Sequence, residues 1–166
     1  VIQFFGTGGT NSVMMVKTWA ARLRAAGIGF IGALQIQESD LPSIGDAALG
    51  LVSTTHYVEN GDNPINKALW AQWFKDFGPN PSSVPDIATC AVYDAMELIY
   101  RAVAKFGPKV TGDQAVGFYK GITIPSPRGS ITIDPKTRDV VQNIYVQRVE
   151  KVNGKLQNVP FDVVKD

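Results

Sequence analysis

The stretch Val1-Ile2-Gln3-Phe4-Phe5-Gly6-Thr7-Gly8-Gly9-Thr10-Asn11 opens the chain and decides its fold. Its first five residues are mostly β-branched or aromatic, which is typical of a buried strand. The turn residues from Gly6 onward lead into a helix that should start near Asn11 or Ser12, because either side chain can cap a first turn. The stretch therefore predicts a strand, a glycine-rich turn and a helix in direct succession.

Two further strands extend this pattern. Apolar residues recur at helical spacing from Val13 to Leu23, and Gly27 is expected to end the helix. Residues 28–31 and 49–56 read as the second and third strands, with a short helical turn around residues 39–44 between them. Alternation of strands and helices favours right-handed parallel connections. We therefore expect an α/β fold with a parallel sheet.

The middle of the chain predicts helices. Asp62-Asn63-Pro64 is a helix start, because a capping side chain precedes a proline at the first helical position. Asp86 should cap a long helix that ends at Gly107, and Thr111 with Gln114 has the spacing of a capping box. Four aromatic residues of the first of these helices are expected to pack in the core: Trp70, Trp73, Phe74 and Phe77.

After Gly121 the apolar period changes to two, which predicts strands at residues 122–124, 130–133 and 140–149. Asn153-Gly154 is a strong signal for a two-residue hairpin turn, so the chain should end in antiparallel hairpins. Three parallel strands are few for a doubly wound sheet. Together with a strand that begins at Val1, this shortage leads us to expect a trimmed chain with an incomplete sheet.

Composition excludes several classes of protein. The 166 residues carry 16 basic and 15 acidic side chains, a net charge of +1, so a nucleic-acid partner is not expected. One cysteine, Cys90, and one histidine, His56, allow no intrachain disulfide and no Cys/His zinc site. No apolar run approaches the ~20 residues of a membrane span. We expect no metal and no cofactor.

The loop from Gly6 to Asn11 is the most informative candidate site. Free backbone N–H groups at a helix start attract carboxylates or phosphates. The loop has neither the lysine of a Walker sequence nor the full spacing of a dinucleotide site. The second strand should end beside it, at Gly32 to Gln35, where ligands of open α/β sheets gather. For both segments an ordinary turn is an equal alternative.

Other reactive side chains favour structural roles. His56 ends the third strand without a second histidine or a cysteine partner, so we expect a structural histidine. Cys90 lies among apolar residues of a helix and should be a buried, inert thiol. Glu38 and Asp40 could act as an acid and a base, but they lie in a short polar turn and are expected to be solvated.

Several stretches together resemble a known family, the type I periplasmic solute-binding proteins that serve ABC importers for leucine, isoleucine and valine. The similarity runs through essentially the whole chain in matching order. The stretches that carry it are Gly45-Asp46-Ala47-Ala48-Leu49-Gly50-Leu51-Val52-Ser53-Thr54-Thr55-His56-Tyr57, Asn63-Pro64-Ile65-Asn66-Lys67, Tyr93-Asp94-Ala95-Met96-Glu97-Leu98-Ile99-Tyr100, Ser126-Pro127-Arg128-Gly129, Ile131-Thr132-Ile133-Asp134-Pro135 and Arg138-Asp139-Val140-Val141-Gln142-Asn143.

The resemblance implies the C-terminal half of a two-lobed protein that closes on a small ligand without catalysis. Residues 1–58 would belong to the second lobe, residues 59–135 would return to the first, and residues 136–166 would cross back. The ligand-facing residues carried over by position are Thr7, Gly8, Gly9, Ala33, Leu34 and Gln35, with the start of the long helix at 87–89 contributing less. No catalytic residue is implied.

One departure bears on the ligand. Amino-acid binders of this family commonly place an acidic residue where this chain has Ala33, and a buried ammonium without a counter-charge is costly. We therefore hypothesise an aromatic or aliphatic carboxylate ligand rather than leucine. The resemblance implies a periplasmic location and an ABC permease as partner.

Two other functions and one form of assembly stay open. The first alternative is an enzyme that uses His56, and the second is a ligand-sensing domain of a regulator or signalling receptor with the same fold. A separate 166-residue fragment is also expected to form a homodimer.

Overall fold

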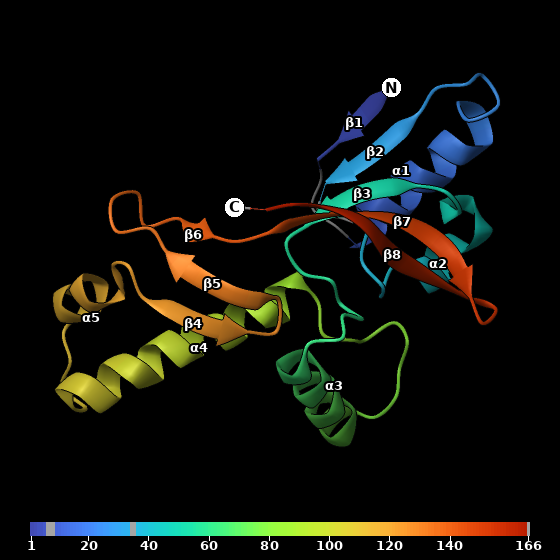
Figure 1. Ribbon diagram of the computed structural model, residues 1–166. Helices are drawn as coiled ribbons and strands as arrows, with labels where there is room; N and C mark the ends of the chain where they lie inside the picture. The colour runs from blue at the N-terminus through green and yellow to red at the C-terminus, as the bar shows by residue number, and fades with distance from the viewer. Residues whose placement is uncertain (6–8, 34–35, 166) are drawn as a thin grey trace.

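Two sheets organise the computed structural model, which describes residues 1–5, 9–33 and 36–165 (Figure 1). The first sheet has the strand order β1-β2-β3-β7-β8, with bounds β1 Ile2–Phe4, β2 Phe30–Ala33, β3 Val52–Thr55, β7 Ile144–Val152 and β8 Lys155–Val164. The second has the order β4-β5-β6, with bounds β4 Thr123–Ser126, β5 Gly129–Ile133 and β6 Val140–Val141. The predicted α/β fold class is confirmed.

The first three strands are parallel, as the sequence predicts. Helix α1 (Gly9–Arg22) connects β1 to β2, and the short helices α2 (Leu41–Ile44) and η1 (Gly45–Ala48) connect β2 to β3. The first helix begins two residues before the earlier of the two predicted caps. Because β1 and β2 are parallel neighbours, with Phe4 opposite Gly32, their carboxyl ends lie at one edge of the sheet.

The helices bury one face of this sheet. The core between them consists of Val16, Trp19, Phe30, Ile36, Leu41, Ile44, Ala48, Leu51 and Val149. On the other face Ile31 is 40% exposed, although parallel sheets are usually covered on both faces. The prediction that Val1 to Phe5 is a buried strand is therefore wrong: β1 is a half-buried edge strand, and Phe5 is 76% exposed.

Three helices accompany the second sheet: α3 (Pro64–Phe77), α4 (Ile87–Phe106) and α5 (Gly112–Tyr119). Their predicted starts are confirmed, because Asn63 and Asp86 accept first-turn N–H bonds and Thr111 forms a capping box with Gln114. Helix α4 packs against β4. No helix among the described residues is both long and apolar enough to cross a bilayer.

Large apolar side chains nevertheless remain on the surface of these helices. The aromatic residues of α3 do not form a buried core, since Trp70, Trp73 and Phe74 are half-buried and Phe77 is 67% exposed. This corrects the expectation that all four pack inside. Helix α4 exposes a second apolar face, made of Val92, Tyr93, Met96, Ile99, Tyr100, Val103 and Phe106.

The chain crosses between the two sheets twice in the described part. Residues 56–63 lead from β3 to α3, and Gln142 with Asn143 separates β6 from β7. The single strand predicted over 140–149 is therefore divided, because β6 pairs with β5 in one sheet and β7 pairs with β3 in the other. The hairpin turn at Asn153-Gly154 is confirmed; both residues have positive φ, 50° and 78°.

Candidate functional site

The candidate ligand site lies at the carboxyl ends of β1 and β2. Of its predicted residues, Gly9 is the first residue of α1 and Ala33 is the last residue of β2. Gly9 has φ +58° and open space around it, and Ala33 is half-buried. Thr7, Gly8, Leu34 and Gln35 lie outside the described residues. The two described members stand at the same sheet edge, while their contact with a ligand stays a prediction.

His56 follows the end of β3, the third strand of this edge. It is half-buried, and burial lowers the pKa of the imidazole, with the Arg128 cation lowering it further and the Asp94 carboxylate opposing them. The His56 side chain has no hydrogen bond or ion pair to another described residue, so nothing in that part of the chain orients the ring as a general base would require. The arrangement favours the structural role that the sequence suggests.

A buried arginine joins three segments beside His56. Arg128, in the turn between β4 and β5, donates to Asp94 Oδ2 of α4 at 2.9 Å from Nε and 2.6 Å from Nη2. Its Nη1 also donates to Gln142 Oε1 at 2.7 Å, in the segment that crosses between the sheets. The two charged side chains are 7% and 5% exposed. Arg128 thus fixes the crossing segment to α4.

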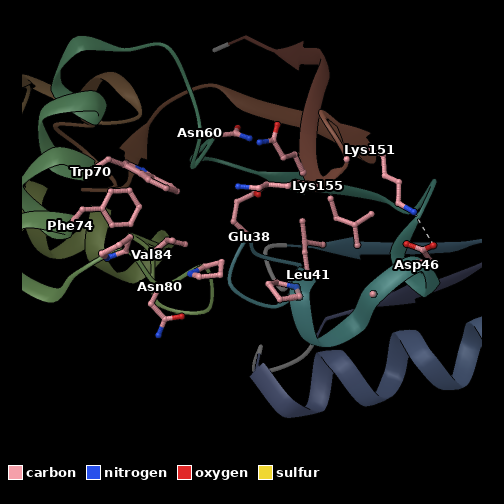
Figure 2. Close-up of a pocket in the computed structure, with 17 residues that line it drawn as sticks. Glu38, Leu41, Asp46, Asn60, Trp70, Phe74, Asn80, Val84, Lys151 and Lys155 are labelled. Carbon is pink, nitrogen blue, oxygen red and sulfur yellow. Dashed lines mark hydrogen bonds and ion pairs between the residues drawn. The ribbon is translucent and has the colours of Figure 1, made fainter.

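A groove of about 700 Å³ lies between helix α3 and the segment that follows β2 (Figure 2). Trp70 and Phe74 of α3 and buried Val84 form one wall, and Leu41 and Glu38 face them from the segment after β2. Volumes of this size are typical of small-molecule sites. Neither of the two described site residues, Gly9 and Ala33, is among the lining residues of this groove.

Carboxyl groups are buried at the edge of this groove. Asp40 and Glu59 are each 7% exposed, and Glu38 is half-buried. Burial raises the pKa of all three, most strongly that of Glu59, which Glu38, Asp86 and Asp40 raise further. The expectation that Glu38 and Asp40 are solvated is wrong, because residues far along the chain cover their turn.

Stability should therefore depend on pH through Glu59. The folded-state pKa lies above the ordinary 4.5, so the folded form keeps a proton that the unfolded chain has lost. Stability present at low pH is lost as the pH rises from 4.5 through the raised pKa. We expect Glu59→Gln to reduce this loss and to stabilise the protein at neutral pH, as measured by urea unfolding between pH 5 and 7.5.

Glu150→Gln is the matched control, because the Glu150 side chain is nearly half exposed. Its Oε1 atom lies 3.9 Å from Arg148 Nη1, so its ion pair is in contact with water. This control should keep the pH dependence of the wild type. Equal pH slopes for wild type and Glu59→Gln would contradict the prediction.

Cys90 has no sign of reactivity. It is 0% exposed, and burial raises the pKa of its thiol to about 11, which confirms the predicted inert cysteine. In residues 1–5, 9–33 and 36–165, no group of three or more His, Cys, Asp or Glu side chains is arranged to hold a metal ion.

The amino-acid sequence is similar to those of known proteins. A family model described as "Periplasmic binding protein" matches residues 4–155. A curated relative, "Leu/Ile/Val-binding protein homolog 6" of Brucella abortus, is 34% identical over 154 residues, which are 92% of this chain and 39% of that protein. The chain thus spans about two fifths of the length of this relative.

Structural comparison gives the same picture. A solute-binding protein of an ABC transporter from Rhodopseudomonas palustris HaA2, in complex with p-hydroxybenzoic acid, is 36% identical with a TM-score of 0.90; the match covers 99% of this chain and 45% of that one. A solute-binding protein from R. palustris BisB5, in complex with 3,4-dihydroxybenzoic acid, is 38% identical with a TM-score of 0.86, over 98% and 44% of the two chains.

Sequence reasoning missed the pairing of Arg128 with Asp94 and the hydrogen bonds around Glu59. Both stretches that contain the ion pair belong to the resemblance, yet their residues are 34 positions apart and no local pattern joins them. One signal was available: an aspartate among the apolar residues of the long helix needs a partner if it is buried.

Proposed function

This chain belongs to the periplasmic binding protein family, and on that premise we propose that the protein captures an aromatic carboxylate for an ABC importer. It would bind the ligand without transforming it and pass it to the permease from the periplasm. The observation that carries the ligand class is the apolar residue Ala33 at the carboxyl end of β2. An ammonium group held there would lack a counter-charge from that position, which is costly in a buried site.

The relatives support this choice in part. The two solved proteins at 36% and 38% identity carry hydroxylated benzoic acids, whereas the curated relative at 34% is named for leucine, isoleucine and valine. Identity alone does not separate these ligands. The combination of Ala33 with the start of α1 at the same sheet edge favours an anionic ligand, because a helix N-terminus attracts negative charge.

The proposed binding mode uses two lobes. Residues 1–58 and 136–166 would form one lobe, and residues 59–135 would belong to the other, with the ligand against Thr7, Gly8, Gly9, Ala33, Leu34 and Gln35. Two facts support it: the first sheet draws its strands from both ends of the chain, and a groove separates this sheet from α3. The exposed face of α4 is where an isolated 166-residue chain would self-associate, so the homodimer stays a prediction.

Isothermal titration calorimetry on the protein as its gene encodes it tests the ligand. We expect 4-hydroxybenzoate to bind at least about 100-fold more tightly than leucine, a difference of about 2.7 kcal/mol. The control ligand is 4-hydroxybenzyl alcohol, which keeps the ring and lacks the carboxylate, and it should bind weakly. Tight leucine binding without a response to aromatic acids would overturn the proposal.

A further inference from the structure

The segment that follows β2 is held by hydrogen bonds from two distant parts of the chain. Asn158 of β8 donates from Nδ2 to the carbonyl oxygen of Ile36 at 3.1 Å, and its backbone N–H donates to Glu38 Oε1 at 2.7 Å. Glu38 in turn donates its backbone N–H to Glu59 Oε2 at 2.9 Å. Residues 36–38 are thus tied to β8 on one side and to the crossing segment 56–63 on the other.

These contacts are sheltered from water. Ile36 is 2% exposed, Asn158 is 4% exposed and Glu59 is 7% exposed. A buried carbonyl or N–H that loses its partner cannot recover a water molecule, so each bond is costly to break. The segment therefore has one strongly favoured position.

This position matters for the strand end. Ile36 comes three residues after Ala33, so the Cα atoms of the two residues can be at most about 10 Å apart. Fixing the Ile36 carbonyl therefore limits how far Ala33, the last residue of β2, can move. The same segment carries Glu38 and Leu41 on the groove wall opposite Trp70 (Figure 2).

We infer that Asn158 and Glu59 are positioning residues, which hold the ligand-contacting end of β2 in its binding arrangement. This inference rests on the proposed function. The side chains do not need to touch the ligand, because they act through the backbone of residues 36–38. Glu59 also connects this backbone to α3, since its carbonyl oxygen accepts from Asn66 Nδ2 at 2.8 Å.

The first experiment measures the affinity for 4-hydroxybenzoate by calorimetry on the protein as its gene encodes it. Asn158→Ala and Glu59→Leu should each raise Kd by roughly fivefold or more, because only part of the population would keep the competent arrangement. Glu59→Gln keeps an oxygen acceptor for the Glu38 N–H and should restore the wild-type Kd. Gln147→Ala is the matched control: Gln147 is a buried amide of neighbouring β7 that bonds to Ser53 Oγ at 3.1 Å and not to the segment.

The second experiment needs no ligand. Hydrogen exchange should become faster at the Glu38 amide in Asn158→Ala and in Glu59→Leu, and should stay unchanged there in Gln147→Ala. An unchanged Kd in Asn158→Ala, or a loss in Gln147→Ala of the same size, would overturn the positioning role alone. A wild-type protein that binds no aromatic acid would overturn the proposed function, and the inference with it.

Discussion

Arg128→Ala is expected to lower the free energy of unfolding by about 3–5 kcal/mol, because it leaves a buried carboxylate without its cation. The Asp94 side chain is 5% exposed and accepts two hydrogen bonds from the guanidinium. The substitution also removes the donor to Gln142, which fixes the segment between the two sheets. Urea unfolding followed by circular dichroism measures the loss.

A second ion pair on the same helix provides the control. Arg101 bonds to Glu97 Oε1 at 2.7 Å, but both side chains are about one-third exposed. Arg101→Ala should therefore cost less than about 1 kcal/mol. The double variant Arg128→Met with Asp94→Leu should recover much of the loss, because it removes both buried charges. Equal costs for the two single alanine variants would show that burial of the first pair has no energetic consequence.

The second large effect concerns the ligand. Ala33→Asp is expected to weaken 4-hydroxybenzoate binding by at least about 100-fold. The new carboxylate would stand at the half-buried end of β2, beside the proposed place of the ligand's own carboxylate. Like charges brought together at an interface cost several kcal/mol. Calorimetry with 4-hydroxybenzoate and with leucine measures the change, and leucine should gain affinity through its ammonium group.

Two variants separate charge from other effects of this substitution. Ala33→Asn has nearly the same size without the charge and should bind far better than Ala33→Asp. Ile31→Asp places the same charge on the same face of β2 but two residues before the strand end, at a residue that is 40% exposed, and should weaken binding far less than Ala33→Asp. If Ala33→Asp binds aromatic acids normally, the ligand's carboxylate lies elsewhere.

Elements with a local signal could be predicted from the sequence. The caps at Asn63 and Asp86 and the turn at Asn153-Gly154 depend on neighbours within a few residues, and the structure confirms each. The strand-end location of the ligand site is also inferred from local topology, and it stays a prediction. The caps and the turn depend only on residues that are close in the sequence, so a single sequence is enough to predict them.

Features that depend on distant partners could not be predicted. Glu38 looks solvated in its own stretch, yet its carboxylate meets the N–H of Asn158, 120 residues later. The break at Gln142 within one apolar run reflects a change of pairing partner, which the run itself does not encode. The exposure of Phe77 likewise depends on what packs beside α3 rather than on its own periodicity.

The place of the tryptophans has a practical consequence. Trp70 lines the groove and donates to Tyr57 Oη at 3.3 Å, whereas Trp19 is buried in the core of the first sheet and Trp73 donates to the carbonyl of Ser83. Of the three tryptophans, all of which lie in the described residues, Trp70 alone lines the groove. An indole on this wall is a built-in fluorophore, so the emission of Trp70 would report the closure that the proposed function requires without any attached dye.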